Sequence, residues 1–280
     1  MKIITVGAGF IASHLPYDNT KYRLAPSKDN ILQFIEDYKP DVIINGIGFC
    51  GSPNIDQCEE LKSRTYMTNV IIPAMLAEEC EKHNIRMIQI GSGCIYFGES
   101  PNKYYSILEG KNIDSGWKEE DFANPKSFYS KTKYACDLLL SQMSNNLTLR
   151  IRMPISNKDN PRNLINKLRN YKQVIDIPNS VTFVDDLVRC VDWAIKENKT
   201  GIFHVTNTEP LTAAKVMKEY QYYNSFHSFE IITEAELDLL TVAKRSNCII
   251  DNSKLEKAGF KMSNSEEALQ KCMQEYWENI

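Results

Sequence analysis

The feature that most constrains this chain is a regular alternation of short apolar runs with longer amphipathic stretches in its first half. The apolar runs have the length of buried strands, and the stretches between them place apolar residues at helical spacing. Parallel strands joined by crossover helices produce this pattern, so the sequence predicts an α/β fold around a doubly wound parallel sheet. The predicted strands are Ile3–Val6, Val42–Asn45, Met87–Ile90 and Leu147–Arg152, and the predicted helices are Asp29–Tyr38, Leu61–Lys82 and Ser127–Met143.

The second half of the chain has a looser pattern, which begins near residue 154 and is punctuated by proline. We therefore expect one domain over residues 1–153 and a smaller lobe over residues 154–280, built onto the first without a linker. The two are expected to interleave, with residues 172–207 packing back on the sheet of the first domain. The predicted elements are the helices Leu164–Asn170, Val184–Lys196, Thr212–Tyr223 and Ser265–Trp277 and the strand Gly201–Val205.

Charge and cysteine usage exclude several classes of protein. The 280 residues carry 33 basic and 36 acidic side chains, and a net charge of -3 leaves no cationic footprint for nucleic acid or a membrane surface. No apolar run approaches the roughly 20 residues of a membrane span. The eight cysteines are scattered without metal-ligand spacing, so we expect reduced thiols, no metal site and a cytoplasmic location. Two glycines interrupt the apolar N-terminus, which favours a strand and turn over a signal peptide.

A glycine-rich turn follows the first predicted strand and is expected to open a helix. Its sequence is Gly7-x-Gly9-x-x-Ala12, with Phe10 and Ile11 between the last two positions. In dinucleotide-binding domains, such glycines allow a tight turn and a close backbone approach, and the helix N-terminus faces the pyrophosphate. A purely structural turn is the alternative. The glycine turn lies at the start of the alternating strands and helices, and this position favours a cofactor-binding Rossmann domain over residues 1–153.

A tyrosine and a lysine one helical turn apart form the second motif. Tyr129 and Lys133 open the helix after a long loop that follows a sheet strand, where chemistry would be located. In short-chain dehydrogenases such a lysine lowers the phenol pKa from about 10 and holds the nicotinamide ribose. The pair Tyr17 and Lys21 has the same spacing, but lies where no active-site helix is expected. Ser92, at the end of the strand before the loop, could hydrogen-bond a substrate carbonyl beside Tyr129.

Longer motifs carry a resemblance to a known family. The chain resembles the extended short-chain dehydrogenases/reductases. Within them it is similar to bifunctional 3,5-epimerase/4-reductases that act on UDP-4-keto-6-deoxy-D-glucose. The resemblance runs from about Asp41 to about Ser253, and its carriers include the segments 51–59, 68–70, 93–95, 118–121, 127–133, 149–156, 160–163, 177–180 and 245–247. The first glycine turn departs from the family pattern, because its loop is shorter and ends in Ala12 where glycine is usual.

The resemblance implies roles for individual residues. It makes Tyr129 the acid of the reductase and Lys133 its partner, and it makes Ser92 the hydroxyl beside them. Cys94 and Lys167 match the acid/base pair implicated in epimerisation. The matching segments imply further binding residues: Asn45, Gly46 and Asn69 for the dinucleotide, and Pro53, Asn54, Arg162, Asn163 and Arg245, beside Ser92 and Cys94, for the nucleotide-sugar.

The function that the resemblance implies is 3,5-epimerisation followed by NADPH-dependent 4-reduction of a UDP-4-keto-6-deoxyhexose, such as the precursor of UDP-L-rhamnose. The ketone acidifies its neighbouring carbons, and the same ketone accepts hydride. Two other enzymes remain alternatives: one with the same chemistry on a 2-acetamido sugar, inverting either both carbons or C3 alone, and a plain 4-ketoreductase. A dinucleotide-binding regulatory protein is the alternative outside enzymes, although such proteins typically lack the tyrosine or the lysine.

Two expectations concern the cofactor and the assembly. No carboxylate follows the predicted strand Lys21–Leu24, whereas Arg23, Ser27 and Lys28 could meet a 2′-phosphate. We therefore predict NADPH, with NADH as the alternative because Asp29 lies about 20 residues past the glycine turn. The resemblance also implies a homodimer formed through the tyrosine-bearing helix and the helix before it.

Overall fold

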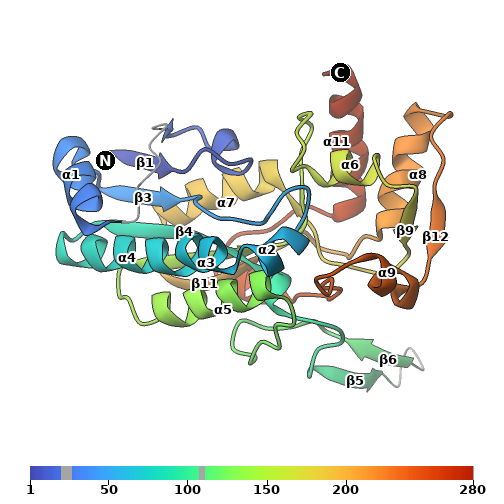
Figure 1. Cartoon of the computed structure of the whole chain (residues 1–280), viewed down its shortest axis with the longest axis horizontal. Coiled ribbons are helices and arrows are strands. Elements are labelled where there is room, and N and C mark those ends of the chain that lie inside the picture. Colours follow the sequence, from blue (N-terminus) through green and yellow to red (C-terminus); the bar gives the residue numbers. More distant parts are fainter. Residues whose placement is uncertain (20–26, 107–110, 280) are drawn as a thin grey trace.

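A six-stranded parallel sheet forms the centre of the protein (Figure 1). The computed structural model describes residues 1–19, 27–106 and 111–279. The strand order is β11-β7-β4-β3-β1-β2, and every pair in it is parallel, which confirms the predicted doubly wound sheet. The strands are β1 Ile3–Val6, β2 Asp18–Asn19, β3 Val42–Asn45, β4 Arg86–Ser92, β7 Asn146–Ile151 and β11 Gly201–Val205.

Helices cover both faces of this sheet. On one face, α1 (Lys28–Tyr38), α4 (Ile72–Lys82) and α5 (Phe128–Leu140) pack against β1, β3 and β4. On the other face, α7 (Val184–Lys196) packs against β4, β7 and β11. The predicted helix and strand at 184–196 and 201–205 have the observed bounds. Each fully buried leucine or isoleucine in these layers contributes about 1.5–3 kcal/mol relative to an exposed side chain.

Local sequence explains where α1 begins and ends. Ser27 caps it, because its hydroxyl accepts a hydrogen bond from the backbone amide of Asn30 at 3.3 Å. Ile31, Phe34 and Ile35 form one buried stripe at the spacing of a helix face. Lys39 ends the helix in a left-handed conformation with φ 44°.

The segment 56–82, expected to hold one helix over Leu61–Lys82, is divided. It contains α2 (Asp56–Glu60), α3 (Lys62–Tyr66), a π-helical turn (Met67–Ile71) and α4. Pro73 explains the π turn, because proline has no amide hydrogen for the usual bond to the carbonyl four residues earlier. The helix axis therefore continues from α3 into α4 through the π-helical turn, which is locally wider and lies beside α5.

The glycine turn after β1 is followed by much less helix than the sequence predicts. Only one 3-10 turn, Ala12–His14, forms there, and β2 follows at Asp18–Asn19. Pro16 accounts for the early end, since a residue before proline is held in an extended conformation, and Leu15 has ψ 132°. The expected helix N-terminus that would face a pyrophosphate is thus absent from this turn within the described residues. The predicted strand Lys21–Leu24 lies outside the described residues.

A second lobe lies beyond the carboxyl ends of β1 and β3, at the right of Figure 1. Its core joins α6, α8 and α11 to two small parallel sheets. Within the described ranges, no helix has both the length and the apolar character needed to cross a bilayer. The elements are α6 Leu164–Leu168, α8 Ala213–Tyr223, α11 Ser265–Glu278, β8 Pro154–Ile155, β9 Gln173–Ile175, β10 Thr182–Phe183 and β12 Glu230–Ile232. The chain also holds α9 Glu234–Leu240, α10 Ser253–Lys257, and an antiparallel hairpin of β5 Lys103–Ser106 and β6 Lys111–Asp114.

Candidate active site

The strand order reverses between β1 and β3, and this creates a crevice at their carboxyl ends. Two glycines form its floor. Gly7 has φ +104°, and a Cβ there would lie 3.0 Å from the backbone of Gly46 and Ile47. A Cβ at Gly46 would lie 3.1 Å from the Cβ of Ala12. Gly9 is different, because a Cβ there would have no atom nearer than the Gly46 carbonyl at 3.9 Å. The crevice therefore has a tightly packed base and an open rim at Gly9.

Two further residues of the turn have buried or partly buried side chains. The Phe10 ring is buried and packs edge-on against His14 at 4.9 Å between centroids. Ile11 packs partly buried against the core beneath the sheet. Phe10 therefore has little side-chain surface left for a cofactor, and the predicted cofactor contacts of both residues stay predictions.

Two predicted dinucleotide ligands have amide groups that serve the fold instead. Asn45 donates to Gln89 at 2.8 Å and accepts from the Ile47 amide at 3.0 Å. Asn69 binds both backbone groups of Phe49, accepting from N at 2.7 Å and donating to O at 2.9 Å. Both side chains are fully buried. Asn45 and Asn69 therefore position the strand-end loops that the prediction assigns to the dinucleotide, and their own contact with a cofactor stays a prediction.

The residues predicted to meet a 2′-phosphate are only partly described. Arg23 lies outside the described residues. The Ser27 hydroxyl caps α1, and Lys28, beside it, lies 3.6 Å from the Glu79 carboxylate. The Lys28 side chain is 58% exposed, so its ion pair is weak and its ammonium group is accessible to an anion.

Tyr129 and Lys133 lie in the first two turns of α5, beside the end of β4. Ser127 caps this helix by accepting from the Ser130 amide at 3.1 Å. The Lys133 side chain is buried, and its ammonium group donates to the Ile90 carbonyl at 3.3 Å. Helix capping and this hydrogen bond fix the pair against the strand that carries Ser92.

The pKa of Tyr129 depends on its burial and on its charged neighbours. Burial raises the pKa of Tyr129 well above its ordinary value, and negative charge on Cys94 and Cys50 would raise it further. A hydrogen bond with Ser92 opposes these effects without overcoming them. The lowering of this pKa by Lys133 stays a prediction, because burial has the largest effect on Tyr129 in the protein without ligands. The phenol is a proton donor at neutral pH.

Cys94 and Lys167 come from different lobes and share one site. Cys94 lies in a 3-10 turn (Gly93–Ile95) directly after β4, and its amide donates to the Ser92 hydroxyl at 3.2 Å. Lys167 lies in α6. Burial lowers the pKa of Lys167, while the thiols of Cys50 and Cys94 act to raise it. The lysine thus titrates nearer to neutrality than an exposed lysine.

Two residues of the site were missed in the sequence. Cys50 follows β3 and accepts a hydrogen bond from Arg162 at 3.1 Å, and its charge acts on both Lys167 and Tyr129. Arg152, just beyond β7, donates to the Cys94 sulfur at 2.9 Å. Both residues stand at the carboxyl end of a predicted strand, which was the signal that could have found them.

The predicted substrate ligands divide into two groups. Arg162 reaches the Cys50–Gly51 turn and belongs to the site. Arg245 lies near Lys167 but forms a two-pronged ion pair with Asp56 at 2.8 and 3.0 Å.

Three other predicted ligands border the site or support the fold. Asn54, just before α2, accepts a hydrogen bond from the Asp56 amide at 2.8 Å, and Pro53 beside it is exposed. Asn163 is fully buried and its amide binds the backbone of Ser156 and Lys158, so it supports the loop before α6, and its contact with the nucleotide-sugar stays a prediction.

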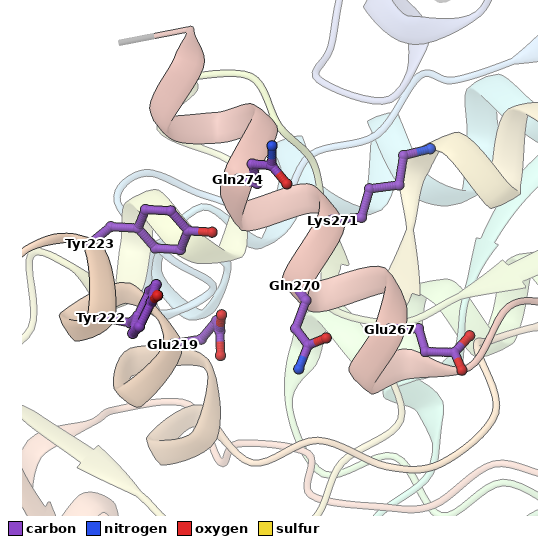
Figure 2. Close-up of a pocket in the computed structure, with 7 residues that line it drawn as sticks. All are labelled: Glu219, Tyr222, Tyr223, Glu267, Gln270, Lys271 and Gln274. Atoms are coloured by element: carbon purple, nitrogen blue, oxygen red, sulfur yellow. The ribbon is translucent and has the colours of Figure 1, made fainter.

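A separate hollow of about 600 Å³ lies between α8 and α11, on the outside of the second lobe (Figure 2). Figure 2 shows side chains of both helices around it, among them Tyr222, which is 82% exposed, and Lys271. None of the candidate site residues lines it. Elsewhere in the described residues, no group of three His, Cys, Asp or Glu side chains is arranged to hold a metal ion.

The parallel sheet and the helices on both of its faces form a Rossmann-like α/β fold. A solved UDP-rhamnose synthase from Acanthamoeba polyphaga mimivirus superposes with a TM-score of 0.88 at 24% identity, covering 98% of this chain and 99% of that one. A dTDP-4-dehydrorhamnose reductase from Bacillus anthracis, solved with NADP, superposes with a TM-score of 0.79 at 20% identity, covering 98% and 99%.

The sequence matches the family described as the RmlD substrate binding domain over residues 16–278, and the chain belongs to that family. The resemblance found from the motifs is thereby confirmed. A bifunctional dTDP-4-dehydrorhamnose 3,5-epimerase/reductase from Arabidopsis thaliana is 37% identical over 231 residues, which are 81% of this chain and 74% of the relative. A trifunctional UDP-glucose 4,6-dehydratase/3,5-epimerase/reductase of the same plant is 38% identical over 246 residues, which are 87% of this chain. The match covers 36% of that relative, so this chain spans about a third of its length.

Proposed function

We propose that the protein reduces the 4-ketone of a UDP-4-keto-6-deoxyhexose with NADPH, after inverting C3 and C5 of the same sugar. The observation that carries this proposal is the Ser92 hydroxyl, which hydrogen-bonds to Tyr129 and accepts from the Cys94 amide at 3.2 Å, with Lys167 close enough to feel charge at Cys94. The relatives named above bear these activities in their names, which supports the same assignment here.

The crevice suits a dinucleotide. Gly9 leaves open space at the rim, and Lys28 provides an accessible cation near the start of α1. The backbone from Gly7 to Ile11 would hold the pyrophosphate, Lys28 would meet the 2′-phosphate, and Lys133 would hold the nicotinamide ribose. When bound, NADPH supplies the hydride that the ketone accepts.

In the reduction, Tyr129 donates the proton. Its raised pKa keeps the phenol protonated, and Ser92 hydrogen-bonds to it. The two hydroxyls together would hold the ketone oxygen, and Tyr129 would protonate the alkoxide that forms there. Lys133 then stabilises the phenolate that remains.

In the epimerisation, Cys94 and Lys167 exchange protons with carbon. Inversion requires removal of a proton from one face of the ring and delivery of a proton to the other. Cys94 is attached to the main sheet and Lys167 to the second lobe, so a ring between the lobes would meet one group on each side. We therefore propose that residues 1–153 bind NADPH, that residues 154–280 contribute the sugar side, and that residues 172–207 complete the sheet.

Two measurements on UDP-4-keto-6-deoxy-D-glucose test this function. The first is NADPH oxidation, and the second is deuterium uptake at C3 and C5 in D₂O without NADPH, followed by NMR. Tyr129→Phe should reduce NADPH oxidation by about 10²- to 10⁴-fold and leave deuterium uptake in place. Tyr134→Phe, which removes a hydroxyl from the same helix, is the matched control and should keep both activities.

Cys94→Ser and Lys167→Met should slow deuterium uptake and keep NADPH binding. Uptake at wild-type rates in both variants would assign the epimerisation to other residues. NADPH oxidation by the wild type with no deuterium uptake would make the protein a plain 4-ketoreductase. Neither activity on any UDP-4-keto sugar would refute the proposed function.

A further inference from the structure

Glu59 reaches the start of the helix that carries Tyr129. It belongs to α2 (Asp56–Glu60), which lies beside one end of α5 (Figure 1). Its half-buried carboxylate accepts a hydrogen bond from the backbone amide of Phe128 at 2.6 Å, and Phe128 directly precedes Tyr129. Segment 51–59, one of those that carry the family resemblance, ends at Glu59, and the resemblance assigned this residue no role. Glu59 thus contacts the chain one residue away from the proposed proton donor.

This carboxylate binds an amide that the cap of α5 does not reach. The first amides of an α-helix have no partner within the helix, and an N-cap side chain binds the amide two or three residues after it. Ser127 follows this rule, since its hydroxyl accepts from the Ser130 amide at 3.1 Å. The Phe128 amide, only one residue after the cap, is bound by Glu59 instead. Negative charge is also favourable at this end of a helix. Two side chains from distant parts of the sequence therefore fix the first turn of α5.

Other contacts restrain the chain on both sides of Tyr129. The Lys62 ammonium group, carried by α3, lies over the Phe128 ring at 5.8 Å from its centroid. After Tyr129, the Thr132 hydroxyl donates to the Tyr129 carbonyl at 2.7 Å. The restraint after Tyr129 comes from α5 itself, whereas the restraint before it comes from α2 and α3.

The helix that carries Glu59 is itself held in place. Asp56, in the same helix, accepts from the Ala243 amide at 2.8 Å and forms the two-pronged ion pair with Arg245. Cys58, next to Glu59, is fully buried. A side chain can hold a functional group in place only when its own element is rigid. Contacts with the second lobe and with the core give α2 this rigidity.

We propose that Glu59 is a positioning residue for the reduction, because it fixes the first turn of α5 and thereby the place of the Tyr129 hydroxyl. This inference rests on the proposed function. Neither group assigned to the epimerisation is carried by α5, since Cys94 follows β4 and Lys167 lies in α6. Loss of the Glu59 contact should therefore slow the reduction of the ketone more than proton exchange at carbon. A contact that only stabilised the fold would affect both reactions alike.

The experiment compares Glu59→Ala with Glu60→Ala in the full chain. Glu60 is the exposed neighbour in α2, so its variant loses a carboxylate from the same helix. With UDP-4-keto-6-deoxy-D-glucose, Glu59→Ala should lower kcat for NADPH oxidation roughly ten- to hundredfold, because a misplacement of about 1 Å can cost on the order of 10² in rate. Its KM for NADPH and its deuterium uptake at C3 and C5 of the sugar should stay within about threefold of the wild type. Glu59→Gln, which keeps an acceptor oxygen, should recover most of kcat, and Glu60→Ala should match the wild type.

A second measurement needs no substrate. Hydrogen–deuterium exchange of the backbone amides is followed without ligand in a peptide that covers residues 127–133. Removal of the Glu59 contact should let the first turn of α5 open more often, so exchange should be faster in Glu59→Ala than in Glu60→Ala, on the order of tenfold.

Each outcome decides for or against the proposal. Equal amide exchange in the two alanine variants, or an unchanged kcat in Glu59→Ala, would overturn it. Equal losses of NADPH oxidation and deuterium uptake would also overturn it and leave Glu59 a structural contact. If Glu59→Ala fails to fold, Glu59→Asp, whose carboxylate is one methylene shorter, is judged by the same criteria.

Failure of the proposed function would be recognised separately. If the wild type oxidises NADPH but takes up no deuterium, the KM for NADPH replaces deuterium uptake as the reference for kcat. If the wild type does neither, the proposed function is refuted. The amide exchange then decides alone whether Glu59 fixes the start of α5.

Discussion

The two glycines of the first turn should respond in opposite ways to the same substitution. At Gly7, alanine would adopt φ +104° and place its Cβ 3.0 Å from the backbone of Gly46 and Ile47. A left-handed conformation costs an L-residue about 1–2 kcal/mol, and overpacking against backbone adds about 1–3 kcal/mol. Gly7→Ala should therefore destabilise the protein without ligand by about 2–5 kcal/mol, or roughly 4–10 °C in Tm.

Gly9→Ala is the matched control for packing. Gly9 has no positive φ, and the nearest atom to its added Cβ would be 3.9 Å away. Without ligand, this variant should unfold within about 1 kcal/mol of the wild type, because alanine also restricts the unfolded chain. If the pyrophosphate lies against Gly9 as we propose, however, the methyl group occupies its place. Gly9→Ala should then bind NADPH at least about tenfold more weakly, a loss of about 1.4 kcal/mol.

Thermal unfolding with and without NADPH, together with a fluorescence titration of NADPH, measures both effects. A Tm for Gly7→Ala within 2 °C of the wild type would refute the packing argument (a threshold of roughly 1 kcal/mol). Unchanged NADPH affinity in Gly9→Ala would refute the position assigned to the pyrophosphate. Equal loss of stability in both variants would show that the turn cannot be divided into a packed base and an open rim.

Three further predictions concern the cofactor, an ion pair and the assembly. Lys28→Ala should reduce the kcat/KM preference for NADPH over NADH by about three- to tenfold, and an unchanged preference would remove Lys28 from the 2′-phosphate site. Burial raises the pKa of Asp56, but Arg245 outweighs burial and leaves it below the ordinary value. The ion pair thus stabilises the fold above about pH 4. Urea unfolding at pH 7 should give Asp56→Asn a free energy of unfolding lower than that of the wild type by up to about 1 kcal/mol. This difference should vanish as the pH falls through the lowered pKa of Asp56. Leu138 and Leu139 are exposed on α5, which fits the predicted homodimer. Light scattering should therefore give the wild type a mass of twice 32.2 kDa, and a variant with aspartate at both positions a mass of 32.2 kDa. A wild-type mass of 32.2 kDa would contradict the dimer.

The sequence predicted the central sheet well because each strand is buried on both faces and separated by helices of clear periodicity. Ile3–Val6, Val42–Asn45 and Val184–Lys196 have their predicted bounds. The helix expected after the glycine turn was wrong, since Pro16 ends it after a single 3-10 turn. Pro16 thus prevents the helix that the glycine motif predicts, although Gly7 and Gly9 still shape the turn.

Individual site residues were harder to assign, because residue type does not reveal a hydrogen-bond partner. Three asparagines have side-chain amides that could bind a ligand, yet each of these amides binds another part of the protein. The partners are Gln89 for Asn45, Phe49 for Asn69 and Ser156 for Asn163. Cys50 belongs to no segment of the resemblance, and Arg152 lies in segment 149–156 with no role assigned by it; the fold places them beside Arg162 and Cys94. A strand-end position narrows the choice of site residues, but the partner of each has to be seen in the fold.

The division of the site between lobes has a chemical consequence. In the proposed epimerisation, the thiol and the ammonium group have to act on opposite faces of a ring, which no single strand end can provide. Cys94 is fixed to the main sheet by β4, and Lys167 is carried by α6 of the second lobe. The proposed reduction has no such requirement, because Ser92 ends β4 and Tyr129 lies in α5, which packs on the main sheet. A change that shifts the second lobe should therefore impair proton exchange at carbon more than hydride transfer.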